Sequence, residues 1–234
     1  MRQGIRRFFL PMCLAAGLAA CSNEGVNPIF DAAVKEVNPF DQPTEEAAPR
    51  GAPVMRAAVN RADVAMIRAR VHGDKAPTYL QAASRNGPYV DYISGLRQSI
   101  IMVGSQITGT RGLGYDLLSA TSSQPDPLSR PIPVAAWPAG VTRSYEFPAN
   151  GPQGRIETFQ CRFERGPARE IVILDERHQG IEVSEYCEGP TGKFENLHLA
   201  DASTGRVWRS LQWTGFRQGN IDIEVVLPYT GGTN

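Results

Sequence analysis

The stretch ITGTRGLGYDLLSA, residues 107–120, carries the residue types of a phosphate-binding loop, because glycines follow a run of β-type residues. The dinucleotide fingerprint is G-x-G-x-x-G, and a P-loop requires a lysine after its second glycine. This loop reads G-x-x-G-x-G without a lysine, and YDLLSA is too short for the helix that a phosphate site uses. We therefore expect no nucleotide site. The loop is predicted to join a buried strand to a short helix, with Leu113, Leu117 and Leu118 packed against one end of the domain.

Other residues able to do acid–base or nucleophilic chemistry are scattered along the chain. His72, His178 and His198 lie far apart, and each is predicted to be a surface or strand histidine rather than a ligand. Asp175 and Glu176 are adjacent, so on a strand they would point to opposite faces. Neither a G-x-S-x-G elbow nor an H-E-x-x-H motif is present. The sequence therefore predicts no catalytic residue, no cofactor and no metal site.

Aromatic side chains matter if the ligand is a glycan, because sugar rings stack on indole and phenol faces. Trp208 and Trp213 are five residues apart, so on a regular strand they face opposite sides. Trp213 shares its face with apolar residues, which predicts burial, whereas Trp208 shares a polar face that suits solvent or a partner. We take Arg111, Tyr115 and Trp208 as candidate contacts for a partner or a glycan. Burial in the core or at a strand rim is the simpler alternative for each.

The cysteines point to an oxidising compartment. Cys13 lies in the N-terminal apolar segment, and Cys21 ends the sequence LAAC. Cys161 and Cys187 remain, and each shares a strand face with apolar residues, so the two thiols could meet across paired strands as a disulfide. Two buried free thiols are the alternative. Neither belongs to a C-x-x-C pair, which argues against redox catalysis and zinc binding.

The N-terminus has the pattern of an export signal. A stretch with three arginines is followed by the apolar segment 8–18, which is too short to span a bilayer. The sequence LAAC resembles the bacterial lipobox, so we expect residues 1–20 to be a lipoprotein signal peptide and Cys21 to carry acyl chains such as palmitate. An ordinary secretory signal is the alternative. Ser22 stands where an aspartate would resemble an inner-membrane retention signal, so we expect the periplasmic face of the outer membrane.

The charge and composition of the remaining chain limit its partners. Without residues 1–20 it carries 21 basic and 24 acidic residues, a net charge of 21 − 24 = −3. This is not the basic footprint of a nucleic-acid-binding protein. Residues 21–54 are rich in Pro, Ala, Glu and Asn, and they are predicted to form a flexible tether behind the lipidated cysteine.

Residues 55–230 are predicted to form one β domain. Short β-type runs follow one another at a spacing of about 10–12 residues, with Gly, Pro and Asn between them, and no long helical period interrupts them. SIIMVGSQI, residues 99–107, is apolar on both faces and is expected to be one fully buried strand. The fold class is therefore mainly β: a single antiparallel meander forming a β-barrel or β-sandwich, with one or two short helices.

Several segments together resemble a known family. TRGLGYDLLSA, and PYVDYISGLRQSIIMVGSQITGTRGLG around it, are similar to the YjbF family of bacterial lipoproteins, also called the group 4 capsule lipoprotein family. CRFER, EYCEG, FENLHL and GRVWRSLQWTGF resemble its C-terminal half, and the likeness covers roughly residues 55–228. YVDYISG departs from the family's pattern, in which a tryptophan-containing strand followed by an aspartate turn is expected. The family has no established catalytic residues to carry over.

The resemblance implies a mainly β periplasmic domain that serves capsule or exopolysaccharide export. Its implied companions are an outer-membrane β-barrel and a second periplasmic protein of the export machinery. The expected function is a non-enzymatic accessory lipoprotein that docks onto these partners. A carbohydrate-binding module for the nascent polysaccharide is the second hypothesis. A polysaccharide-modifying hydrolase or lyase, with two carboxylates that converge only in the fold, is the third.

Overall fold

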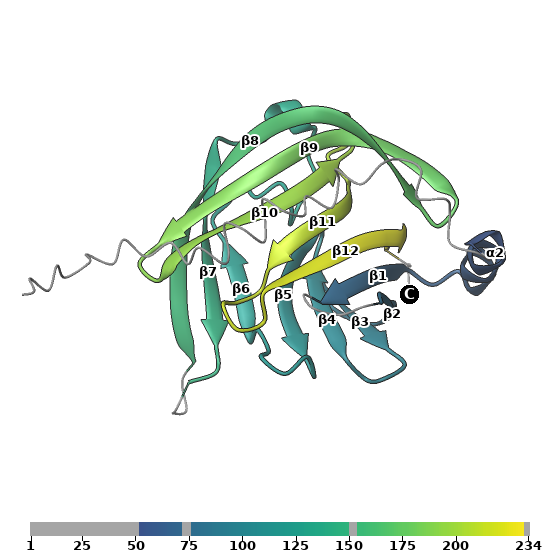
Figure 1. Cartoon of the computed structure of the whole chain (residues 1–234), viewed down its shortest axis with the longest axis horizontal. Coiled ribbons are helices and arrows are strands. Elements are labelled where there is room, and N and C mark those ends of the chain that lie inside the picture. The colour runs from purple at the N-terminus through teal and green to yellow at the C-terminus, as the bar shows by residue number, and fades with distance from the viewer. Residues whose placement is uncertain (1–51, 72–75, 150–153, 232–234) are drawn as a thin grey trace, which may run out of the picture.

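The computed structural model describes residues 52–71, 76–149 and 154–231, and their fold is a nearly closed, antiparallel β-barrel (Figure 1). The predicted signal peptide, Cys21, nearly all of the tether and His72 lie outside the described residues. The strands are β1 (Met66–Val71), β2 (Thr78–Asn86), β3 (Tyr89–Ser94), β4 (Ser99–Val103), β5 (Gln106–Arg111), β6 (Ser119–Ser122), β7 (Gly140–Phe147), β8 (Arg155–Ile173), β9 (Glu176–Gly189), β10 (Gly192–Ala200), β11 (Val207–Trp213) and β12 (Asn220–Leu227).

The strands pair in the order β5-β4-β3-β2-β1-β12-β11-β10-β9-β8-β7-β6. Nearly every strand thus pairs with its neighbours in sequence, and the first strand pairs with the last, from Met66 opposite Leu227 to Val71 opposite Ile221. The mainly β antiparallel meander is confirmed, in the form of a barrel. Its two edge strands, β5 and β6, meet at a seam, where the Thr110 N–H donates to the Leu117 carbonyl at 2.9 Å.

An aromatic cluster fills one part of the barrel interior. The Trp213 ring stacks on Phe194 with centroids 4.1 Å apart, and the edges of Tyr145 and Phe159 meet the same indole at 5.1 and 5.4 Å. Trp213 is fully buried, as its sequence face predicts. Aromatic pairs in these stacked and edge-to-face arrangements add to the hydrophobic stabilisation of the core.

The segment after the glycine loop corrects one expectation, because residues 115–118 form no helix and lead directly into β6. Leu117 is fully buried and Leu113 packs partly against the core, but Leu118 is 37% exposed. The loop instead runs from one edge strand to the other. A helix is therefore unnecessary to bury Leu117.

Two strand boundaries also differ from the expectation. Residues 99–107 are not one strand: they include a tight turn at Gly104 between β4 and β5, where φ is +59° and a Cβ would lie 2.3 Å from the Leu128 carbonyl oxygen. Conversely, β8 runs without interruption through Gly166 and Pro167, with a register shift between Arg165 and Ala168. The long β8–β9 hairpin arches over the barrel (Figure 1).

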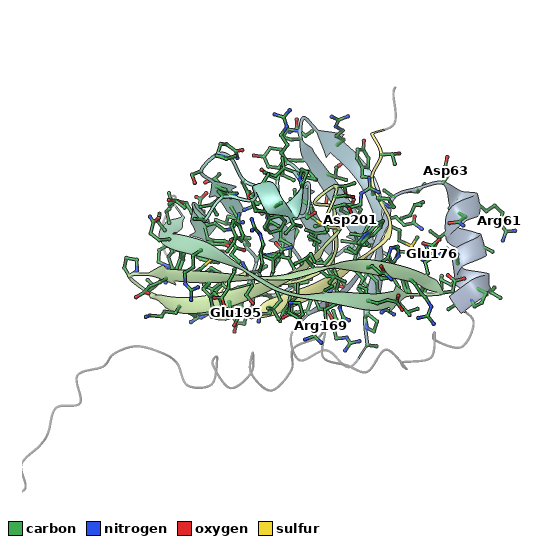
Figure 2. All side chains as sticks on the ribbon, turned by 90° about the horizontal axis from the view of Figure 1, so that it is seen from above. Arg61, Asp63, Arg169, Glu176, Glu195 and Asp201 are labelled. Carbon is green, nitrogen blue, oxygen red and sulfur yellow. A yellow bond between two sulfur atoms is a disulfide. The ribbon has the colours of Figure 1, made fainter. Side chains whose placement is uncertain are left out.

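The helix of the fold lies earlier than expected, at the junction with the predicted tether. Helix α2 (Ala52–Ala62) buries Ala52, Arg56 and Val59, which lie on one face. Figure 2 shows it at one end of the molecule, with Glu176 on its barrel-facing side and Arg61 on its outer side. A short 3₁₀ turn, η1 (Val134–Ala136), lies between β6 and β7. Within the described ranges, no helix has the length and apolarity needed to cross a membrane.

Arg56 fastens α2 to the barrel. Its guanidinium donates to the carbonyls of Val226 at 2.6 Å and Ile173 at 2.8 Å, and it forms an ion pair with Asp175 at 3.1 Å. Because the side chain is buried, these bonds satisfy a charge that would otherwise be costly to bury. One arginine thereby joins the start of the domain to both β12 and the β8–β9 turn.

Candidate functional site at one end of the barrel

The candidate site is a cleft formed by four chain connections at the same end of the barrel. In a meander, alternate connections emerge at one end, and here the β5–β6, β7–β8, β9–β10 and β11–β12 connections do so. They enclose a cleft of about 650 Å³, which we call the end cleft. Its lining is Gly114–Asp116, Phe147–Ala149, Arg155, Glu157, Thr191 and Gly215–Gln218.

The glycine loop forms one wall of the end cleft, and its backbone amides are already engaged. The Asp116 carboxylate accepts from the N–H groups of Gly112 at 2.8 Å and Leu113 at 3.0 Å, and from the Thr110 hydroxyl at 3.1 Å. These amides are the groups with which a phosphate-binding loop would hold its ligand. An internal carboxylate therefore occupies the place that a phosphate would take.

Tyr115 stands at the mouth of the end cleft. Its side chain is 55% exposed, and its backbone N–H donates to the Gln218 amide oxygen at 3.2 Å. The guanidinium of Arg217, an exposed residue on the β11–β12 turn, lies 5.3 Å from the Tyr115 ring centroid. Phe216, which also lines the end cleft, packs edge-on against buried Trp213, with ring centroids 5.0 Å apart. An open ring face and a cation are thus held on two rigid turns.

A second arginine and a buried carboxylate form the opposite wall. The Arg155 guanidinium forms an ion pair with Glu157 at 2.7 Å and lies 5.8 Å from the Phe147 ring centroid. Glu157 is buried, and it also accepts a hydrogen bond from the Thr191 hydroxyl at 2.5 Å. Both carboxylates of the end cleft, Asp116 and Glu157, therefore have partners of their own.

The structure separates the three predicted contact residues. Tyr115 lies in the end cleft, whereas Arg111 donates to the carbonyls of Thr110 at 2.6 Å and Leu117 at 3.1 Å and so braces the glycine loop. Trp208 lies elsewhere, half-buried and packed on His178 with ring centroids 4.1 Å apart and the ring planes tilted by 31°. Burial lowers the pKa of His178, so the neutral imidazole is favoured in this stack.

Sequence reasoning did not select the arginines of the end cleft, Arg155 and Arg217. A signal for Arg217 is present in GFRQG, residues 215–219, where an aromatic residue and an arginine sit in a turn bounded by glycines. Turns position binding residues more often than strands do. Arg155 carries no comparable signal, because only the barrel brings it near the other three connections.

The barrel interior holds a buried polar cluster away from the end cleft's lining. Arg143 of β7 forms ion pairs with Glu185 of β9 and, at 3.3 Å, with Asp126 from the β6–β7 connection. Glu185 also accepts from the Asn196 amide at 2.8 Å, and His198 Nε2 lies 3.1 Å from it. All five side chains are buried, so this cluster stabilises the interior and is closed to a large ligand.

Electrostatics in this cluster keep the ions charged. Burial by itself would raise the pKa of Glu185, but Arg143 and the hydrogen bonds from His198 and Asn196 lower it to about 2. Burial likewise opposes the charge on Arg143, yet Glu185 and Asp126 raise its pKa above the ordinary arginine value. The arginine and Glu185 therefore remain ionised over the physiological pH range.

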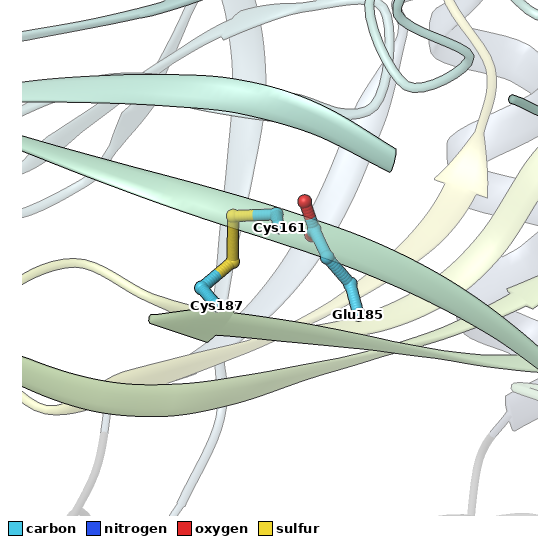
Figure 3. Close-up of side chains that lie close together, drawn as sticks. All are labelled: Cys161, Glu185 and Cys187. Atoms are coloured by element: carbon cyan, nitrogen blue, oxygen red, sulfur yellow. A yellow bond between two sulfur atoms is a disulfide. The ribbon is translucent and has the colours of Figure 1, made fainter. Parts of the chain in front are cut away.

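Glu185 also lies beside the disulfide between Cys161 and Cys187 (Figure 3). The two cysteines face each other directly in the β8–β9 ladder, which confirms the predicted pairing. Among the described residues, these three offer the one grouping of potential metal ligands that lie within 4.8 Å of one another. Both sulfurs are bonded to each other, and a metal requires thiolates, so the oxidised protein offers no metal centre here.

Comparison with known proteins places the chain among capsule lipoproteins. The family described as "Group 4 capsule polysaccharide lipoprotein gfcB, YjbF" matches residues 30–226. Among solved structures, the fold is similar to that of the hypothetical lipoprotein YmcC from Escherichia coli K12, with a TM-score of 0.64 and 16% identity, over 86% of this chain and 95% of that chain. At this identity the likeness concerns the fold alone. No curated protein matches the sequence.

Proposed function

The chain belongs to the YjbF family of group 4 capsule polysaccharide lipoproteins, and from this premise we propose that it is a non-enzymatic accessory factor in capsule or exopolysaccharide production or export. In this proposal, lipid on Cys21 anchors the protein at the periplasmic face of the outer membrane. The domain docks there onto an outer-membrane β-barrel and a periplasmic partner of the export machinery. The end cleft is the surface through which it acts.

The chemistry of the end cleft is the observation that supports recognition rather than catalysis. A glycoside hydrolase needs two carboxylates that flank the scissile bond and are free to transfer a proton or to attack. Asp116 binds the glycine loop, and Glu157 binds Arg155 and Thr191. The groups that face solvent are Tyr115, Arg155 and Arg217, which contribute ring faces and fixed positive charge.

Direct binding of the polysaccharide is a second candidate function, and the same cleft favours it. Its volume of about 650 Å³ is in the range of small-ligand sites. The Tyr115 ring offers a stacking face for a sugar, and the exposed guanidinium of Arg217 suits a carboxylate of an acidic polymer. A segment of an acidic glycan is therefore the ligand class that this cleft fits.

Site-specific photo-crosslinking in living cells distinguishes the two candidates. A photoreactive phenylalanine replaces Tyr115 in one strain and, as the control, Leu96 in another, since Leu96 is 79% exposed and outside the cleft. Capture of an outer-membrane β-barrel from position 115 alone supports docking. Capture of polysaccharide with no protein overturns docking and supports glycan binding. Identical products from both positions overturn the end cleft as the functional surface.

The proposed anchor is tested separately. The Cys21→Ala variant lacks the thiol that would be lipidated, so we expect it in the soluble periplasmic fraction, with the wild-type protein in the outer-membrane fraction. Cell fractionation followed by immunoblotting measures the distribution. Retention of the variant in the membrane fraction would refute lipid anchoring through this cysteine.

A further inference from the structure

A second hollow lies on the barrel wall along the seam between β5 and β6, apart from the end cleft. Its volume is about 360 Å³, and we call it the seam pocket. Its lining combines residues from strands β2 to β6 and from the β5–β6 connection, most of them polar. The residues that matter to the argument are Ser84, Asn86, Tyr89, Asp91, Thr108 and Thr121.

The alternation of β3 explains why polar side chains gather there. Val90 and Tyr92 point into the barrel core, so Tyr89 and Asp91 point outward. Ser84 of β2 lies opposite Asp91 in the ladder, and Ile101 of β4 lies opposite it on the other side. The seam pocket is therefore built on the outer face of the sheet, with Asp91 in the middle of three strands.

One carboxylate oxygen of Asp91 lacks a hydrogen-bond donor. Its Oδ1 atom is buried, and it has no hydrogen-bond partner among the described residues. Burying a carboxylate oxygen without a hydrogen-bond donor lowers the stability of the fold, and local packing does not explain why this oxygen is buried. By contrast, Thr108 already donates to the Ile101 carbonyl at 3.2 Å. Within the pocket lining, Asp91 Oδ1 is therefore the buried acceptor that lacks a donor.

Gly109 lies beside two of the lining residues of the seam pocket, Ile101 and Leu118. Gly109 lies opposite Ile101 in the β4–β5 ladder, and a Cβ at this position would lie 3.3 Å from the Ile101 Cδ1 atom and 3.5 Å from the Leu118 carbonyl oxygen. Tyr89, 42% exposed, supplies an aromatic face at the rim. An acceptor, hydroxyl groups and a ring face therefore surround an open space.

We propose that the seam pocket binds a single pyranose unit of a polysaccharide chain. Asp91 accepts hydrogen bonds from the sugar hydroxyls, and the Tyr89 ring covers an apolar face of the sugar. A hard cation such as Ca²⁺ fits less well, because it takes six to eight oxygen ligands and Asp91 is the one carboxylate in the pocket lining. The inference rests on the proposed function in taking the ligand to be a glycan, but it concerns a different surface from the end cleft.

Saturation-transfer difference NMR on the full-length protein in detergent micelles tests this inference. The probes are the methyl glycosides of glucose, galactose, mannose and glucuronic acid. We expect at least one to bind the wild-type protein, and Asp91→Asn to weaken it roughly ten- to hundredfold, because a hydrogen bond to a charged acceptor is lost. The matched control is Leu96→Ala, because Leu96 is exposed and lines neither hollow, and this variant should bind that glycoside as the wild type does. A Tyr115→Ala variant, measured alongside, reports any binding of the glycoside in the end cleft.

Thermal unfolding guards against a trivial loss of structure. Asp91→Asn keeps the shape of the side chain and removes negative charge from a carboxylate whose buried Oδ1 lacks a donor, so its Tm should equal or exceed that of the wild type. Saturation of none of the four glycosides, or equal binding by Asp91→Asn and wild type, would overturn the seam pocket as a sugar site. Equal loss of binding in Tyr115→Ala would assign the signal to the end cleft and also overturn the inference. The proposed function is tested separately by photo-crosslinking from position 115, so a failure of either proposal can be told from a failure of the other.

Discussion

Removal of the Arg143 guanidinium should destabilise the domain more than any surface change of the same kind. In Arg143→Met, Glu185 and Asp126 stay buried while their shared cation is gone. Breaking a buried ion pair in this way costs about 3–5 kcal/mol of unfolding free energy, because an uncompensated charge remains. The total stability of a domain is only about 5–15 kcal/mol, so the variant should remain folded with a small margin or unfold partly.

The pH dependence of that loss is the sharper part of the prediction. In the wild type, the pKa of Glu185 is lowered to about 2, below the ordinary value of 4.5, so its stabilising contribution is present above pH 4.5 and is lost as the pH falls from there. Without Arg143, burial dominates and raises the pKa of Glu185 above 4.5. The variant should then gain stability as the pH falls from 7 towards 4.5, and the gap between the two proteins should narrow.

Urea unfolding followed by tryptophan fluorescence, at pH 7 and at pH 5 with the disulfide intact, measures both effects. The matched control is Arg162→Met, since Arg162 is exposed and pairs with exposed Glu164 at 3.0 Å. Exposed pairs contribute about 1 kcal/mol or less, so this control should unfold near the wild-type midpoint at both pH values. A loss in Arg143→Met below 1 kcal/mol, or one that is unchanged between the two pH values, would refute the role assigned to the buried cluster.

Two further predictions concern the covalent link and the helix clasp. Replacing Cys161 and Cys187 by serine should lower the unfolding free energy by about 3.5 kcal/mol in the chain-entropy model for their separation of 26 residues; an unchanged urea midpoint would contradict the disulfide. Arg56→Gln removes the ion pair with Asp175, and the shorter side chain loses the hydrogen bonds to the carbonyls of Val226 and Ile173. Backbone hydrogen exchange in Ala52–Ala62 should therefore become at least tenfold faster, while exchange in β10 stays unchanged. Equal protection of the helix in both proteins would show that Arg56 is dispensable.

Period-2 alternation made much of the barrel predictable. It placed Trp213 in the core, and it set Cys161 and Cys187 on faces where they could meet. The alternation pattern did not predict the turn within residues 99–107, because buried residues flank Gly104 on both sides. The turn depends on the close approach of Gly104 to the Leu128 carbonyl, which the local sequence does not show. The pattern failed in the opposite sense at β8, where Gly and Pro at 166 and 167 are accommodated by a register shift rather than ending the strand.

Helix α2 and the end cleft illustrate two different limits of sequence reasoning. Pro53, in the first turn of the helix, is a helix-start signal, but the composition around it favours the end of a tether. In the end cleft, the turn GFRQG gives a local signal for Arg217, but Arg155 has none. Both arginines join Tyr115 in one lining only after four connections gather at one end of the nearly closed barrel. The same holds for Asp91, whose missing donor becomes visible only when its neighbours are in place.

The pairing of β1 with β12 sets the order in which the molecule can be completed. Chains are made from the N-terminus, so β1 can pair with β2 early, but its other edge stays unpaired until β12 has emerged. The β8–β9 hairpin is local, and its disulfide can form while β12 is still missing. A truncation that removes β12 would therefore leave β1 and β11 each with an unpaired edge, and strand edges of this kind invite aggregation. The strand order of the barrel is therefore completed only when β12 pairs with β1.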